Sequence, residues 1–319
     1  MNRAAFLGIA LIAIGIFALV FNFNQPVFST FTSSTIEINE KEVIDGKNIE
    51  TIDVNVSSPS VYLIPTDSNE ITVELIGEIS EKTDFEFDVT SRNNKLDVYV
   101  KNSTTVSGWF NFSTMTTNLQ LELHIPRKEY NKLNVHSSSG RITLNDLHAK
   151  NVELRASSGR IEISNVTAES EINLQTSSGR IEAVNNTAKS LQARASSGRI
   201  LINGQISEQI SPSTSSGSIV LENFEGDVSA AASSGRVSII NDQLVGDINV
   251  STSSGRVEID LKNAPTSALI DFQGSSGRGS VNLPGLDFEE KSNNRVYGTI
   301  GAGKYEIKVR TSSGRFELN

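Results

Sequence analysis

Cysteine is absent from this chain of 319 residues, and that absence excludes several kinds of chemistry. Without thiols the protein has no disulfide, no thiolate metal site, no cysteine nucleophile and no lipid-modified N-terminal cysteine. If it is exported, its stability must come from burial and repetition rather than from disulfide bonds.

Positive charge is also in deficit, with 28 Lys and Arg against 37 Asp and Glu, a net charge of −9. This balance argues against nucleic acid or anionic lipid as the main ligand. We therefore expect no nucleic-acid partner.

Hydrophobic runs of membrane length are lacking except for one, Ala4–Phe21. A helix of that length rises about 27 Å, close to the thickness of a bilayer core. Arg3 precedes the run and no Lys or Arg follows until Lys41, so the positive-inside rule places the N-terminus in the cytoplasm. We predict a transmembrane signal anchor at 1–21, a juxtamembrane stalk at 22–35, and the bulk of the chain outside the cell membrane. A cleaved signal peptide is the alternative, although no convincing A-x-A cleavage site follows.

A repeat dominates the rest of the chain. Ser-Ser-Gly occurs nine times from Gly140 onward, at intervals of 18 to 22 residues apart from a last interval of 37. Arginine follows the glycine in every copy except one, where Ser218 takes its place. Apolar residues alternate with polar ones on both sides of each corner, which is typical of strands with one buried face.

Two architectures fit such strands: an antiparallel meander, or coils stacked as in a parallel β-helix. In stacked coils equivalent residues lie about 4.8 Å apart, so each column favours one residue type, and the faithful repetition favours the coils. We predict an all-β fold, a single-stranded β-solenoid with about 19 residues per coil, following one N-terminal transmembrane helix.

Irregular segments are interpreted within the same scheme. Residues 133–319 are expected to form ten regular coils, with Asn294 replacing a glycine in a tenth, masked corner and with left-handed backbone at the corners. Residues 36–132 are expected to form degenerate coils and a cap, in which Ser57-Ser58-Pro59 copies the corner with proline in place of glycine.

The motifs V-S-S-P-S-V-Y-L-I-P at 56–65 and L-E-L-H-I-P at 121–126, together with the repeats, carry a resemblance to a known family. The chain resembles the bacterial "putative adhesin" family of β-strand-repeat domains, a family of unknown function. That family includes a membrane-anchored member of the Lia envelope-stress operon. The resemblance implies a cell-envelope protein and supplies no catalytic residues.

Catalytic and metal-binding patterns are scarce. The three histidines, His124, His136 and His148, do not follow the coil period, so we interpret them as surface residues rather than a zinc site. No calcium loop, Walker motif or dinucleotide fingerprint occurs. We expect a protein that is not an enzyme and that needs no cofactor.

The arginine that follows each corner is the one repeated feature with a functional interpretation. Glutamate often sits two residues further on, so the column can be a solubilising charged surface. It can also be a row of guanidinium groups that binds an anionic envelope polymer. Its members are Arg141, Arg160, Arg180, Arg199, Arg236, Arg256, Arg278 and Arg315.

Two further surfaces are candidates for contact with a ligand or a partner. The polar loop 101–118 carries Trp109, Phe110 and Phe112, which either cap the core or contact a ligand. The sequence stops inside a repeat, which predicts an open C-terminal coil able to self-associate or to receive a partner strand.

The sequence therefore favours a membrane-anchored, extracytoplasmic scaffold acting in interactions or in the envelope-stress response. Its partners would be an envelope polymer or a membrane protein. The alternative is a surface adhesin or a module that binds an anionic glycan.

Overall fold

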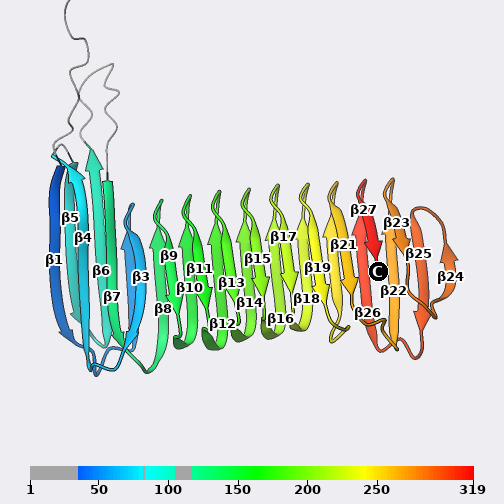
Figure 1. Cartoon of the computed structure of the whole chain (residues 1–319), viewed down its shortest axis with the longest axis horizontal. Coiled ribbons are helices and arrows are strands. Elements are labelled where there is room, and N and C mark those ends of the chain that lie inside the picture. The colour runs from blue at the N-terminus through cyan, green and yellow to red at the C-terminus, as the bar shows by residue number, and fades with distance from the viewer. Residues whose placement is uncertain (1–34, 82, 105–116) are drawn as a thin grey trace, which may run out of the picture.

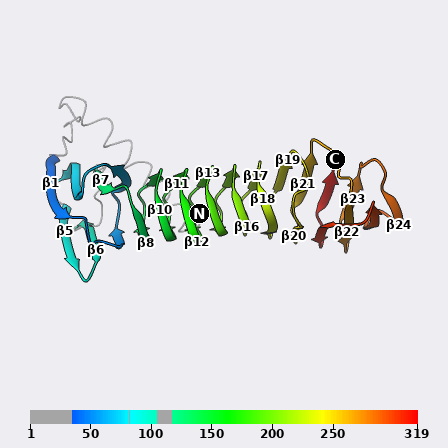
Figure 2. The ribbon, with the colours of Figure 1, turned by 90° about the horizontal axis from the view of Figure 1, so that it is seen from below.

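The computed structural model describes residues 35–81, 83–104 and 117–319, and all regular structure in these ranges is β-strand. The predicted anchor, most of the stalk and the aromatic residues Trp109, Phe110 and Phe112 lie outside the described residues. No helix in the described part of the chain is long and apolar enough to cross a membrane. The strands line up along a rod and form two facing sheets (Figures 1 and 2).

The first sheet has 13 strands. Their order is β1 (Thr35–Asp45), β4 (Glu70–Ser80), β7 (Thr117–Pro126), β3 (Ser60–Thr66), β9 (Ile142–Asn145), β11 (Ile161–Ser164), β13 (Ile181–Val184), β15 (Ile200–Asn203), β17 (Ile219–Glu222), β19 (Val237–Asn241), β21 (Arg256–Leu261), β27 (Arg315–Leu318) and β23 (Arg278–Val281).

The second sheet has 14 strands. Their order is β24 (Asp287–Lys291), β25 (Arg295–Ile300), β22 (Ala268–Gly274), β26 (Tyr305–Thr311), β20 (Ile248–Thr252), β18 (Glu225–Ala232), β16 (Ile206–Thr214), β14 (Thr187–Ala195), β12 (Thr167–Thr176), β10 (His148–Ala156), β8 (Glu129–Ser137), β2 (Thr51–Val56), β6 (Lys95–Thr104) and β5 (Thr83–Arg92).

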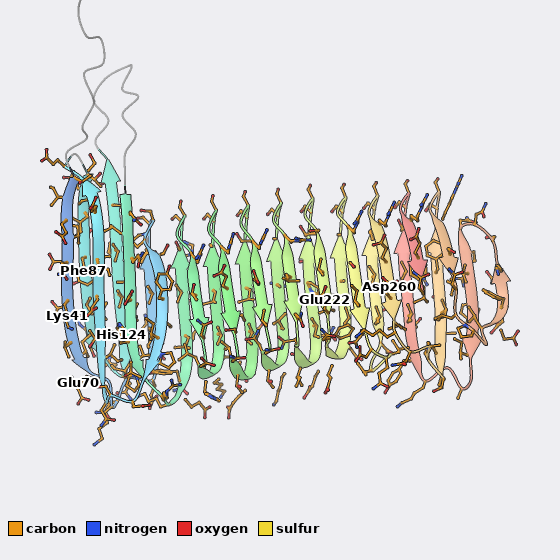
Figure 3. All side chains as sticks on the ribbon, viewed as in Figure 1. Lys41, Glu70, Phe87, His124, Glu222 and Asp260 are labelled. Carbon is orange, nitrogen blue, oxygen red and sulfur yellow. The ribbon has the colours of Figure 1, made fainter. Side chains whose placement is uncertain are left out.

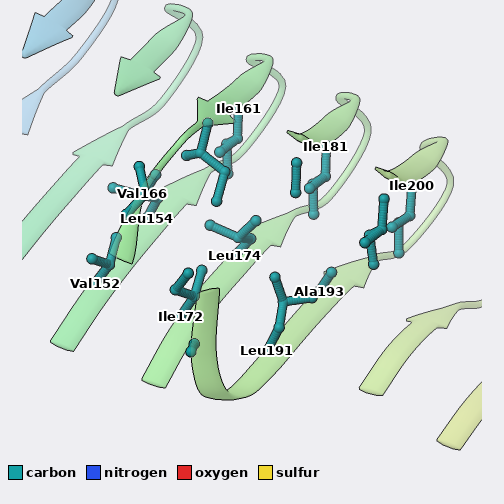
Figure 4. Close-up of a cluster of buried hydrophobic side chains, with 14 of the residues drawn as sticks. Val152, Leu154, Ile161, Val166, Ile172, Leu174, Ile181, Leu191, Ala193 and Ile200 are labelled. Atoms are coloured by element: carbon teal, nitrogen blue, oxygen red, sulfur yellow. The ribbon is translucent and has the colours of Figure 1, made fainter. Parts of the chain in front are cut away.

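Each coil consists of one strand from the second sheet, a Ser-Ser-Gly corner, one short strand from the first sheet and a polar turn. Successive coils pair in parallel, so that Val152 lies beside Ile172 and Ile161 beside Ile181. The alternating apolar side chains point between the two sheets and are fully buried (Figure 4). The prediction of an all-β repeat fold of parallel coils is confirmed.

The prediction of left-handed backbone at the Ser-Ser-Gly corners is wrong. None of the corner glycines has a positive φ, and Asn294 has none either. The corner requires glycine because the coils approach closely: a Cβ at Gly159 would lie 1.9 Å from the carbonyl oxygen of Gly140. Adjacent corners contact each other through their backbones, and a side chain would force them apart.

Left-handed residues occur at the opposite turn of the coil instead. They form a column of Asp146, Asn165, Asn185, Gly204 and Asn223, with φ between 50° and 69°. Asparagine, aspartate and glycine adopt this conformation more easily than other residues. The turn that the sequence marked only as polar is thus the one that needs the left-handed backbone.

The N-terminal segment is part coil and part antiparallel sheet. Strands β2 and β3 form a coil that stacks on β8 and β9, and Pro59 occupies the glycine position as expected, since its carbonyl oxygen faces Gly140. Strands β1 and β4 pair antiparallel, as do β4 with β7 and β5 with β6. This end of the rod therefore differs from the repeats in strand direction.

The C-terminal end also departs from the predicted order of coils. Residues 287–300 form an antiparallel hairpin, β24–β25, that pairs with β22, so the tenth coil expected around Asn294 does not exist. From residue 133 on there are nine coils: β8–β9, β10–β11, β12–β13, β14–β15, β16–β17, β18–β19, β20–β21, β22–β23 and β26–β27.

The last coil in the sequence is not the last coil in space. Strand β26 lies between β20 and β22, and β27 lies between β21 and β23 (Figure 1). Arg315–Leu318 is therefore paired on both sides. The expectation of an open C-terminal coil is wrong, because its backbone groups already bond to two neighbouring strands.

Candidate functional site

The arginine column lies along one edge of the rod, where the chain leaves each Ser-Ser-Gly corner. Arg315 pairs directly with Arg256 on one side and with Arg278 on the other. Earlier in the stack, the carbonyl oxygens of Arg160, Arg180, Arg199 and Arg236 accept backbone hydrogen bonds from the preceding coil at 2.8–2.9 Å. All members are exposed except Arg160, which is half-buried. The structure thus brings together all eight arginines that the sequence singled out.

Glutamates compensate only part of this column. Arg160 lies 3.0 Å from Glu162, and Arg141 reaches the same carboxylate at 3.8 Å. Further along, Arg256 pairs with Glu258 at 3.2 Å and Arg315 with Glu317 at 3.6 Å.

Four arginines form no ion pair within 4.0 Å among the described residues: Arg180, Arg199, Arg236 and Arg278. Arg180 and Glu182 have the same two-residue spacing as Arg160 and Glu162 but form no such pair. Such exposed pairs are worth less than about 1 kcal/mol each, so even the paired guanidinium groups can exchange partners with a ligand.

Serine hydroxyls line the corner beside the arginines. Both serines of each Ser-Ser-Gly corner are exposed in every repeat. We call these serine pairs and the arginines that follow them the arginine edge. It presents a continuous row of hydrogen-bond donors, spaced by about 4.8 Å along the stack.

A shallow groove of about 400 Å³ runs beside the arginine edge on the outer face of the second sheet. Small side chains line it, among them Ser213, Ala231 and Ser251, together with Arg194. Ser196, Ser215, Ser233 and Ser253, the first serines of four corners, also line it. The groove and the arginine edge are therefore one continuous polar surface.

The opposite turns of the coils border a larger hollow of about 930 Å³. Ile206, which is 49% exposed, lines it with Leu244 and Tyr305, and Glu208, Glu225 and Lys189 add mixed charge. Its charges do not repeat from coil to coil, in contrast to the arginine edge.

The three histidines lie apart, as expected from their spacing. His136 and His148 lie on β8 and β10 of the second sheet, whereas His124 lies on β7 of the first. His124 is 3.3 Å from Glu122 and shares a cluster with Glu74, all three half-buried. Sequence reasoning missed this cluster. The alternation of L-E-L-H placed Glu122 and His124 on one face, but only the antiparallel register of β4 and β7 brings Glu74 beside them.

Lys41 completes this cluster from β1. Its Nζ donates a hydrogen bond of 2.7 Å to Glu74 Oε1. That bond outweighs the effect of burial and holds the pKa of Glu74 below its usual value.

A second charged group, on the outer face of the second sheet, fastens the C-terminal hairpin. Asp271 of β22 accepts hydrogen bonds from Arg310 of β26 and Arg295 of β25. Burial opposes the ionisation of Asp271, but the hydrogen bonds from Arg310 and Arg295 prevail and keep its pKa below the ordinary value. Arg295 also reaches Glu290 of β24 at 2.9 Å, so the group ties β22 and β26 to both strands of the hairpin.

The two-sheet stack of parallel coils and its column of repeated side chains define the chain as a β-solenoid. The chain belongs to the family described as Toastrack DUF4097, whose model matches residues 49–319. This finding confirms the resemblance to the "putative adhesin" repeat proteins of unknown function. No curated protein matches the chain.

The solved structures that match the chain do so at low sequence identity. A putative adhesin from Bacteroides fragilis NCTC 9343 is 12% identical with a TM-score of 0.41, covering 90% of this chain and 98% of its own. A putative adhesin from Parabacteroides merdae ATCC 43184 is also 12% identical with a TM-score of 0.41, covering 70% of this chain and 95% of its own. A putative cell adhesion protein from Clostridium sporogenes ATCC 15579 is 11% identical with a TM-score of 0.26, covering 89% and 99%.

Proposed function

We propose that this protein is a non-enzymatic scaffold of the bacterial cell envelope that binds an anionic polymer along its arginine edge. In this proposal residues 1–21 anchor the chain in the membrane and the coils lie outside it. A role in the envelope-stress response is part of the same proposal and rests on the resemblance to the Lia-operon protein.

The observation that carries the proposal is the register of the arginine column. Guanidinium groups at a fixed spacing match a linear polymer whose phosphate or carboxylate groups repeat along its length, because each fork can donate two hydrogen bonds to one anion. Four of the eight arginines have no ion pair within the described residues and need not exchange a partner to bind. The neighbouring serine hydroxyls supply uncharged donors for sugar oxygens.

The net charge of −9 limits how this surface can work. At long range the molecule as a whole repels a polyanion, so binding depends on short-range contacts at the edge. We therefore expect binding that is specific to the edge and that weakens as the salt concentration rises.

The test compares two triple variants of the full-length chain. Arg180→Gln, Arg199→Gln and Arg236→Gln together remove three guanidinium groups of the edge that form no ion pair with any described residue. Lys150→Gln, Lys189→Gln and Lys304→Gln remove the same charge from exposed positions elsewhere. Binding to isolated anionic wall polymer is measured by sedimentation at two salt concentrations.

The arginine variant should bind at least about 10-fold more weakly, since each lost charge-assisted hydrogen bond is worth about 0.5–1 kcal/mol even when exposed. The lysine variant should bind like the wild type. If both variants lose the same amount of binding, the effect depends only on net charge and the proposal is overturned. So would unchanged binding by the arginine variant.

A gain of affinity provides a further check. Ser218 interrupts the column between Arg199 and Arg236, and its carbonyl oxygen bonds to Ile200 like that of its arginine neighbours. Ser218→Arg should therefore strengthen binding to the same polymer. If the protein is instead an adhesin for host glycans, the variants will change binding to an anionic host-matrix polysaccharide and leave wall-polymer binding unchanged.

A further inference from the structure

We infer that Glu74, Glu122 and His124 form a binding site for a divalent transition-metal cation such as Zn²⁺. These three side chains lie on the outer face of the first sheet, at the N-terminal end of the rod, where Figure 3 labels His124 and Lys41. The inference is independent of the proposed function, because the arginine edge contributes no residue to it.

The backbone fixes the positions of the three ligands. Glu74 and Glu122 are directly opposite each other in the antiparallel pair of β4 and β7, and His124 follows Glu122 by two residues on the same face. Cross-strand neighbours have Cβ atoms about 4.5–5.5 Å apart, close enough for their side chains to share one ion. The site is thus built on paired strands rather than on a loop, so little order has to be gained on binding.

The separations of the ligand atoms suit one metal ion. One carboxylate oxygen from each glutamate and one ring nitrogen of His124 all lie within 4.8 Å of one another. Zinc ligands at about 2.1 Å from the metal lie about 3.4 Å apart in a tetrahedron. Side-chain rotation alone can close the remaining difference, since the side chains of His124 and Glu122 are 32% and 26% exposed.

The ligand chemistry selects the class of metal. An imidazole nitrogen with two carboxylates suits zinc and its neighbours in the transition series, whereas calcium and magnesium favour oxygen ligands alone. Three protein ligands leave a fourth position that water can fill, as in zinc sites with one open position.

Lys41 is the competing cation in the metal-free protein. Its ammonium group lies 2.7 Å from Glu74 and neutralises one carboxylate. A bound metal must displace this contact, since Glu74 cannot ligate fully while it bonds to Lys41. Removing the ammonium group should therefore strengthen metal binding, a result that a purely structural role of the cluster would not produce.

The experiment is calorimetric titration of Zn²⁺ into the full-length chain after treatment with a chelator. We expect one zinc per chain, at least about 10-fold weaker binding by His124→Gln and Glu122→Gln, and tighter binding by Lys41→Met. His136→Gln is the matched control, because it removes a histidine from the second sheet. Far-UV circular dichroism verifies that each variant is folded.

Three results would overturn the inference: no zinc binding by the wild type, equal affinity of wild type and His124→Gln, or equal loss in His136→Gln. Co²⁺ supplies a second readout. Its visible absorption should show a nitrogen–oxygen environment in the wild type, and the His124→Gln variant should lose that spectrum.

Discussion

A methyl group added at Gly198 would lie 1.6 Å from the carbonyl oxygen of Gly179 in the preceding coil. The same contact recurs at 1.7 Å between Gly217 and Gly198. No side-chain rotation can relieve such a clash, because both atoms belong to the backbone or are fixed to it. The coils would have to separate locally, and that separation would loosen the core packing around the corner.

Gly198→Ala should therefore lower the free energy of unfolding by about 1–3 kcal/mol, the range found for overpacked sites. The measurement is urea denaturation followed by circular dichroism. Ser197→Ala is the control, since Ser197 is exposed and adjacent in sequence. If the two variants unfold at the same urea concentration, close packing is not the reason for glycine at this corner.

At the residue scale, the sequence correctly predicted where the corners lie, but it gave the wrong reason why each corner requires glycine. Two explanations, left-handed backbone and close approach, both predict glycine in a repeat. Only the stacked register, with Gly159 facing the carbonyl of Gly140, decides between them. The exposure of the arginine column could be predicted from the sequence alone, because it follows directly from the alternation of buried and exposed residues after each corner.

At the scale of elements, the C-terminal hairpin depends on a single buried carboxylate. The side chain of Asp271 is 11% exposed and bonds to both Arg295 and Arg310, while its neighbour Phe272 packs on Phe316 with ring centroids 5.2 Å apart. Removing the negative charge leaves two arginines without their common partner. The loss falls on the contacts among β22, β25 and β26.

Asp271→Asn should cost about 2–3 kcal/mol at neutral pH, somewhat less than a fully buried ion pair. The wild type should also lose this stability in acid. The pKa of Asp271 is lower in the folded than in the unfolded protein, so the contribution is complete above the unfolded value of about 3.9 and declines as the pH falls through the folded value.

Thermal unfolding at pH 7 and at stepwise lower pH measures both effects. The difference in unfolding temperature between wild type and Asp271→Asn should shrink below about pH 4, where Asp271 of the unfolded chain begins to take up a proton while the folded carboxyl, with its lower pKa, still resists protonation. A difference that stays constant down to pH 2 would show that the charge of Asp271 does not stabilise the hairpin.

The hairpins at 83–104 and 287–300 show why strand direction escaped sequence reasoning. Both turns carry paired asparagines, Asn93-Asn94 and Asn293-Asn294, and both resemble a coil corner with asparagine in place of glycine. A polar turn between alternating strands fits a hairpin and a coil equally well. What decides the matter is whether the two strands pair with each other, as β5 does with β6 and β24 with β25, or lie in opposite sheets as the two strands of a coil do.

At the scale of the whole molecule, the order of coils in space differs from their order in the chain. The β26–β27 coil occupies the place between β20–β21 and β22–β23, so the chain passes over one position, forms β22–β25, and then returns to fill it. The period of the repeat predicted the number of residues per coil but not this exchange, because every coil presents nearly the same apolar faces to its neighbours. The opposition of Glu74 and Glu122 was not visible in the sequence either, because it depends on the antiparallel pairing of β4 with β7, whereas the repeat predicts parallel coils.

Because of this order of coils, the same substitution at two buried valines should destabilise segments of different length. Val309 in β26 and Val296 in β25 are both buried, at 0% and 3% exposure, but Val309 lies inside the stack and Val296 near its end. A buried aspartate at either position destabilises its strand, since an unpaired charge is poorly tolerated in an apolar core. The consequences should differ in extent because β22 and β23 depend on β26 and β27 for their contact with the rest of the rod.

Hydrogen exchange measured by mass spectrometry should show this difference. Val309→Asp should abolish protection from residue 268 to the C-terminus while the coils up to residue 261 stay protected, because contacts in a solenoid are limited to nearest neighbours. Val296→Asp should affect only the hairpin at 287–300. If both variants expose the same segment, the C-terminal coil does not hold the end of the rod in place, and the order of strands in the two sheets would have to be revised.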